Sequence, residues 1–169
     1  WVVDHAARGQ RQTAYQILVA TQPALLDQEK GDQWDSGKVV SEDSTQVVYS
    51  GKPLESGGAY CWKVRTWDKD GKASPYSRGA QFEMGLLSAD AWKGQWIGGA
   101  SQLRTEFQLP EAVARARVYI CGPGYYELRI NGTKVGSNVL DPGWTTYEKR
   151  VLYTTYDVTP LLQRGANAV

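Results

Sequence analysis

Apolar and polar residues alternate along most of this chain of 169 residues, in short runs separated by Gly, Pro, Asn and Asp. Alternation with a period of two is typical of strands that bury one face, and helical periodicity is nearly absent. The pattern predicts strands at Ala14–Thr21, Gln46–Ser50, Tyr60–Asp68, Ala80–Met84, Thr105–Leu109, Ala116–Ile120, Tyr125–Ile130 and Arg150–Thr154. Only Val158–Gln163 indicates a helical turn. The predicted fold class is therefore all-β, with antiparallel sheets.

Two of these runs also predict which side of the strand is buried, because a core face needs a continuous apolar set at every second position. Two dipeptides, Asp70-Gly71 and Asn131-Gly132, follow strand-like runs and favour type I′ hairpin turns, since both positions tolerate a positive φ. The second dipeptide also begins a glycosylation sequon, Asn131-Gly132-Thr133, but the turn is a sufficient explanation. The predicted core faces are Tyr60, Trp62, Val64 and Thr66 in one strand, and Tyr126, Leu128 and Ile130 in the other.

A break at residues 86–95 separates two strand-rich parts. Residues 1–85 have the size of a small β-sandwich and lack the Cys…Trp…Cys spacing of antibody domains, which favours a fibronectin type III-like or immunoglobulin-like sandwich. Residues 96–169 are strand-like throughout, and Ala166–Val169 reads as the beginning of another strand. A lone strand without a partner leaves a core uncovered, so we expect this second domain to be incomplete, the sequence having been truncated.

Composition narrows the function classes. The formal net charge is +1, so the chain lacks the excess of basic residues that would bind the phosphates of a nucleic acid. Its apolar runs are far shorter than a membrane span. The chain begins at Trp1 without a signal-peptide pattern, which leaves its localisation open. Trp and Tyr are plentiful, at 7 and 10 residues, and suit both half-buried strands and sugar-binding surfaces.

Three segments resemble the N-terminal region of bacterial α-L-rhamnosidases of glycoside hydrolase family 78. The first is RGQRQTAYQILV at Arg8–Val19, followed by WDSGKV at Trp34–Val39. The second runs from Tyr60 to Gly98, and the third opens with ARARVYI at Ala114–Ile120. Their order and spacing fit the family across nearly the whole chain, and the aromatic-rich stretch Gly124–Thr159 belongs to the same resemblance.

The resemblance implies a domain order and a division of labour. In such enzymes a fibronectin-like domain comes first, a jelly roll of the galactose-binding type follows, then further β modules and an (α/α)₆ barrel. The family hydrolyses terminal α-L-rhamnosides with inversion, which needs an acid and a base on opposite faces of the sugar. Those carboxylates belong to the barrel, so the resemblance places no catalytic residue in this chain. It implies that the rest of the parent chain is the main partner.

Side chains with intrinsic chemistry are few in this chain. His5 is the only histidine and sits in a polar stretch, so we expect a solvated loop residue and no zinc site. Cys61 and Cys121 fall in different predicted domains, which favours free thiols over a disulfide. No cofactor is predicted.

The strongest candidate for a binding site is the segment around Asp141, Trp144 and Tyr147, with Tyr125 and Tyr126 nearby in the sequence. Proteins commonly read sugars with a carboxylate for the hydroxyls and rings for the apolar face. The alternative is that these rings plug the end of the jelly roll or contact a neighbouring module.

Some related jelly rolls bind rhamnose with calcium, through an acidic and an amide residue just before the strand that matches Tyr125–Ile130. Here that position reads Cys-Gly-Pro-Gly at residues 121–124, so no metal is predicted.

The sequence thus predicts a non-catalytic N-terminal piece of an α-L-rhamnosidase with structural or substrate-orienting domains. Two alternatives stay open: a carbohydrate-binding module for rhamnosides, and a plain β-sandwich interaction domain. An unfinished jelly roll also predicts self-association through open sheet edges.

Overall fold

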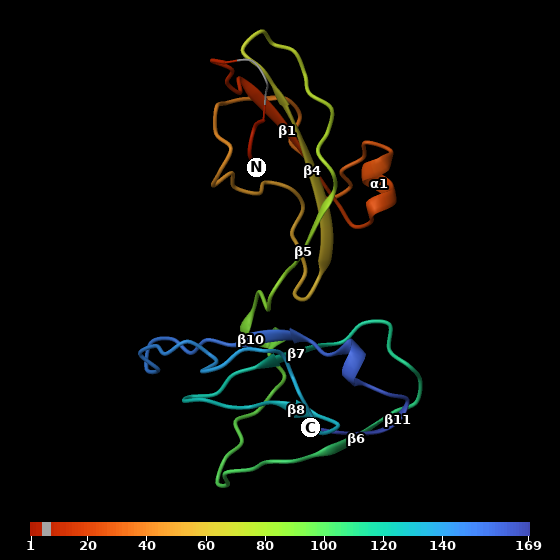
Figure 1. Cartoon of the computed structure of the whole chain (residues 1–169), viewed down its shortest axis with the longest axis vertical. Helices are drawn as coiled ribbons and strands as arrows, with labels where there is room; N and C mark the ends of the chain where they lie inside the picture. Colours follow the sequence, from red (N-terminus) through yellow and green to blue (C-terminus); the bar gives the residue numbers. More distant parts are fainter. Residues whose placement is uncertain (5–7) are drawn as a thin grey trace. The chain divides into compact units, whose positions relative to one another are not determined.

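A computed structural model describes residues 1–4 and 8–169, and His5 lies outside the described residues. The chain divides into two units, Trp1–Gly94 and Gln95–Val169, which are taken separately below. The regular structure is almost entirely antiparallel β, as the alternation predicts (Figure 1). Within the described residues, no helix has the length and apolarity needed to cross a membrane.

The first unit is built on one antiparallel sheet. Strands β1 (Ala14–Ala20) and β4 (Ala59–Trp67) pair at its centre along the whole of β1, and Figure 1 shows them side by side. Short strands β2 (Trp34–Asp35) and β3 (Val39–Val40) pair with β1, and β5 (Ala80–Glu83) pairs with the other edge of β4. The strands predicted near β1, β4 and β5 are confirmed.

Both faces of this sheet carry a hydrophobic core. One face holds the predicted Tyr60 and Val64 set against residues of β1, which confirms that face as the core side. The opposite face is also buried at its Cys61 end, because α1 (Pro23–Asp27) lies across it with Leu26 buried. This helix was not predicted; it begins at a proline, whose missing N–H costs nothing in a first turn. The buried residues of the first face are Tyr15, Ile17, Val19, Tyr60 and Val64, and those of the second are Leu18, Ala20, Leu26 and Cys61.

The strand predicted at Gln46–Ser50 is wrong, since these residues form a bend followed by irregular chain. Gln46 adopts φ 56°, in the left-handed region, which interrupts an extended backbone where the strand would start. The alternation itself is real, because Val47 and Tyr49 pack on the first core while Val48 is exposed. The side chains therefore follow a strand pattern without a ladder of backbone hydrogen bonds.

The second unit consists of short antiparallel pairs. Strand β6 (Glu106–Leu109) pairs with β11 (Gly165–Ala168), β7 (Arg117–Ile120) with β10 (Thr154–Asp157), and β8 (Arg129–Ile130) with β9 (Thr133–Lys134). A 3₁₀ turn, η2 (Thr159–Leu161), lies within the predicted helical segment; a second one, η1 (Ala89–Ala91), belongs to the first unit. The core is small and consists of Ile130, Val135 and Val158 with partly buried neighbours.

Three predictions for this unit need correction. The strand expected at Arg150–Thr154 instead occupies β10, because Thr145 and Thr146 fold the chain into a turn that ends at Arg150. Only the last two residues of Tyr125–Ile130 pair in a sheet, although the predicted inward face is right. The strand near Ala166–Val169, expected to lack a partner, pairs with β6.

The two glycine turns differ. Asn131 and Gly132 adopt φ 50° and 81° and join β8 to β9, which confirms the type I′ hairpin. At Asp70-Gly71 only the glycine has a positive φ, so the predicted type I′ geometry is wrong there. The Asp68 carboxylate stabilises that turn instead, accepting hydrogen bonds from the backbone N–H groups of Asp70 and Lys72.

A pair of amide side chains, one of them buried, joins the hairpin turn to the last strand of the second unit. Asn167 is only 3% exposed, and its side chain bonds to the backbone of Gln163 and Gly165. The Asn131 side chain donates to Asn167 Oδ1 at 2.9 Å and accepts the N–H of Ala168. Side-chain hydrogen bonds therefore help to stabilise the second unit, whereas apolar packing dominates in the first unit.

Candidate functional site

Three of the five predicted site residues form an exposed aromatic cluster in the second unit. The Trp144 ring stacks on Tyr147 with centroids 5.6 Å apart and an interplanar angle of 27°. Tyr125 meets the same indole edge-on at 6.0 Å. Trp144 is 69% exposed and Tyr125 57% exposed, so two rings set at 66° to each other present apolar area to the outside of the unit.

Tyr147 holds this cluster in place. Its hydroxyl accepts the backbone N–H of Gly124 at 2.8 Å, which ties the 141–147 loop to the segment just before Tyr125. Gly124 adopts φ 107°, a conformation that side chains rarely tolerate, so the bond depends on glycine at this position. The cluster is thereby built from two segments that are distant in sequence.

Asp141 takes part in a separate network within the loop. Its Oδ2 accepts hydrogen bonds from the Tyr156 hydroxyl and from the Asn138 amide, the latter at 2.8 Å. These donors hold the pKa of the Asp141 carboxyl below its ordinary value, the Tyr156 hydroxyl contributing most. The carboxylate is therefore ionised at neutral pH and already has two donors on one oxygen.

Tyr126 points inward, opposite to Tyr125. Its hydroxyl is buried and has no hydrogen-bond partner among the described residues. Burial raises the pKa of the neighbouring Tyr156, with further contributions from Asp141 and Tyr126. Gly122 permits this packing, since a Cβ there would lie 2.9 Å from the Tyr126 ring. Tyr126 is therefore a structural residue of the loop base.

The structure thus divides the predicted set in two. Trp144, Tyr147 and Tyr125 come together as a surface, whereas Asp141 and Tyr126 belong to the network around Tyr156. Sequence reasoning missed Asn138 and Tyr156. Asn138 stands three residues before Asp141, so the sequence offered it as a nearby hydrogen-bond donor. Tyr156 lies in β10, and the predicted strand ended before it, at Thr154.

Metal-binding chemistry has little support in the described part of the chain. There, no group of three or more His, Cys, Asp or Glu side chains is arranged to hold an ion. Cys61 and Cys121 are free thiols, as the sequence predicts, and burial raises the pKa of each. Neither thiol is therefore an activated nucleophile.

Two models of known protein families match this chain, one in each unit. Residues 1–88 match the model of the Rha78A-like N-terminal immunoglobulin domain, and residues 111–169 match the α-L-rhamnosidase N-terminal domain. The chain therefore belongs to the α-L-rhamnosidase family, which confirms the resemblance seen in the sequence.

Relatives span the whole chain but are much longer. An α-L-rhamnosidase of Formosa agariphila is 38% identical over 199 residues, covering 100% of this chain and 21% of that protein. The structure of the α-L-rhamnosidase from Dictyoglumus thermophilum is 40% identical with a TM-score of 0.92, over 99% of this chain and 21% of that one. The Aspergillus terreus enzyme is 32% identical with a TM-score of 0.76, over 98% and 20%. The chain thus spans about a fifth of the length of these relatives.

Proposed function

We propose that this chain acts as the non-catalytic N-terminal region of an α-L-rhamnosidase, an enzyme that would hydrolyse terminal α-L-rhamnosides with inversion. Both units match domains that the family models describe as N-terminal. Neither of the two hollows beside α1 contains a pair of carboxyl groups, which an inverting glycosidase would need. The chemistry would then belong to the remaining part of such an enzyme.

The observation that carries the proposal is the exposed apolar surface of the second unit. Val139, Leu140 and Trp144, which lie close together in the sequence, are each between 66% and 76% exposed. Large apolar side chains gathered on a surface mark a contact with another protein segment or a ligand. We infer that this surface packs against a neighbouring module of the enzyme and helps to orient the substrate.

The test is to replace Trp144 in a full-length rhamnosidase that carries this region. If the indole packs on another module, Trp144→Ala lowers the thermal stability of the whole enzyme while leaving the 169-residue chain unchanged. Val48→Ala serves as a control, since Val48 is 78% exposed in the first unit. Equal melting temperatures for the Trp144→Ala and parent enzymes would contradict the packing role.

A carbohydrate-binding role is the second candidate, and the geometry of Trp144 and Tyr147 favours it. The exposed Trp144 ring, backed by Tyr147 and flanked by Tyr125, offers the apolar surface that pyranose rings contact, while Asp141 and Tyr126 would support the loop from the network around Tyr156. Titration of the chain with L-rhamnose, with and without calcium, should then quench Trp fluorescence in the parent but not in Trp144→Ala. An unchanged spectrum in both conditions removes this candidate.

Self-association through open sheet edges is a further expectation for the isolated chain. Strand β5 ends the sheet order of the first unit, so no further strand of the described residues lies on its outer side. Sedimentation velocity over a range of concentrations measures this directly. A monomer at every concentration would contradict the expectation.

A further inference from the structure

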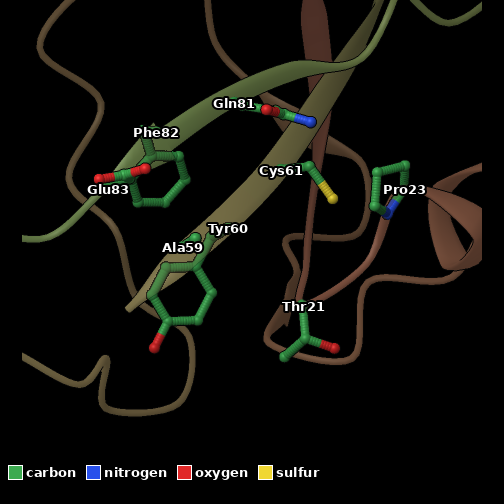
Figure 2. Close-up of a pocket in the computed structure, with 8 residues that line it drawn as sticks. All are labelled: Thr21, Pro23, Ala59, Tyr60, Cys61, Gln81, Phe82 and Glu83. Atoms are coloured by element: carbon green, nitrogen blue, oxygen red, sulfur yellow. The ribbon is translucent and has the colours of Figure 1, made fainter. Parts of the chain in front are cut away.

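Two neighbouring hollows lie beside α1 in the first unit. The first has a volume of about 420 Å³, and Figure 2 shows the Cys61 thiol and Pro23 facing each other across it. The second has a volume of about 340 Å³ and shares Pro23, Cys61 and Gln81 with the first. The second hollow is the more polar of the two; its other lining residues are Leu26, Asp27, Lys63, Ser77, Arg78 and Gly79.

The unusual member of this lining is Lys63, a charged residue that is only 8% exposed. Its Nζ donates one hydrogen bond to the Leu26 carbonyl and lies 4.4 Å from the centroid of the Tyr76 ring. Within the described part of the chain, no carboxylate lies within ion-pairing distance of it. A buried ammonium group has three donors and normally needs an anion. Lys63 thus brings an unneutralised charge and spare donor capacity to the hollow.

One further cation lines the hollow and one lies near its wall. The Arg65 guanidinium is not part of the lining; it lies 4.7 Å from the centroid of the same Tyr76 ring and donates two hydrogen bonds to the Gln16 side-chain oxygen. Arg78 lines the hollow and is exposed. Asp27 also lines the second hollow, and its carboxylate would repel an anion. Together with Lys63 and Arg78, it gives the lining side chains a net charge of +1.

We propose that the second hollow binds the oxyanion group of a small acidic ligand, a carboxylate or a sulfate, with Lys63 as its buried counter-ion. Lys63 supplies a desolvated ammonium, Arg78 a guanidinium fork at the mouth, and the Ser77–Gly79 segment flanks the opening. The volume admits a single monosaccharide carrying such a group. This proposal is independent of the role of the aromatic surface in the second unit.

The test uses the whole 169-residue chain and follows the amide resonances of Ser77, Arg78 and Gly79 by NMR. Glucuronate and inorganic sulfate are titrated in separate arms, and neutral L-rhamnose is the control. We expect saturable shifts with at least one anion and none with rhamnose. Response to glucuronate alone assigns a sugar carboxylate, response to sulfate alone assigns a sulfate-type anion, and response to both assigns a general oxyanion site.

Three variants determine whether the named charges are responsible. Lys63→Met keeps the length of the side chain and should abolish the response. Arg78→Gln and Asp27→Asn change exposed residues, so folding is expected to persist; binding should weaken about fivefold in the first and tighten about threefold in the second. The proposal is overturned if neither anion gives a saturable shift, if rhamnose acts equally, or if these two exposed variants bind like the parent.

Discussion

The two units bury their apolar residues in different ways. The first unit covers both faces of its sheet, and Leu18 on β1 is completely inaccessible. The second unit has a core of three buried apolar residues and an amide pair, while Trp144 remains 69% exposed. Apolar side chains on an outer surface need a partner to become buried. The first unit therefore has the larger closed core, and the proposed contact would bury apolar side chains that the second unit leaves exposed.

Removing a core side chain from the first unit should give the largest effect. Leu18→Ala leaves a cavity in a site that is fully enclosed, and we expect a loss of about 3 kcal/mol in the free energy of unfolding of that unit. Denaturant unfolding, followed by NMR signals assigned to each unit, measures this. Leu87→Ala is the matched control because Leu87 is 52% exposed. Equal losses in the two variants would break the description of the first unit as a closed core.

The second unit should depend on the buried amide of Asn167. Asn167→Ala removes four hydrogen bonds that involve its side chain, leaving buried partners unsatisfied, so we expect about 2 kcal/mol of destabilisation confined to this unit. The control is Gln102→Ala at an exposed position of the same unit. If Asn167→Ala unfolds like the control, apolar packing alone would stabilise the second unit.

Acid should weaken the second unit before the first. Hydrogen bonds from Arg129, Tyr156 and Thr159 lower the pKa values of Glu127, Asp141 and Asp157, respectively. Because each pKa is depressed by folding, the stabilisation is present above the ordinary carboxyl pKa and is lost as pH falls through the lower folded value. In the first unit, the pKa of Asp32 is also lowered, by hydrogen bonds from Thr21.

Hydrogen exchange of the two units between about pH 5 and pH 3 tests this sign. We expect the protection of the second unit to fall more steeply, and Asp141→Asn to flatten that fall. Because all three carboxyl groups are solvent-accessible, salt should reduce the difference. A steeper loss in the first unit would contradict the assignment.

Trp144→Ala should have the smallest effect on the stability of the isolated chain. The indole is mostly solvated, so its removal should change the free energy of unfolding by less than about 0.5 kcal/mol. Thermal unfolding of the chain measures this. A loss as large as that of Asn167→Ala would mean that Trp144 is a core residue and that the exposed surface is misassigned.

The alternation of apolar and polar residues predicted the long strands, because each of them carries its own pattern with a period of two. It gave the burial of Tyr60, Val64 and Ile130 correctly. It misplaced β10, since the turn before Arg150 depends on side-chain hydrogen bonds that no periodicity reports. It also missed the second core face, which exists only because a five-residue helix lies on Cys61.

The residues of the candidate site could be predicted from the sequence, but their arrangement in space could not. The rings of Trp144 and Tyr147 stand close in sequence, so their pairing could be expected. Tyr125 joins them only through the bond between Tyr147 and Gly124, which links distant segments. Asp141 looked like a ligand for a sugar, yet its hydrogen bonds to Tyr156 and Asn138 depend on the fold of a later strand.

The central claim is that this region belongs to an α-L-rhamnosidase without carrying its chemistry. The most direct measurement is the release of nitrophenol from a nitrophenyl α-L-rhamnoside by the purified 169-residue chain, beside a full-length family member at equal concentration. We expect turnover by the full-length enzyme and a rate for the chain equal to that of buffer. Sustained hydrolysis by the chain, lost on a single substitution within it, would contradict the account.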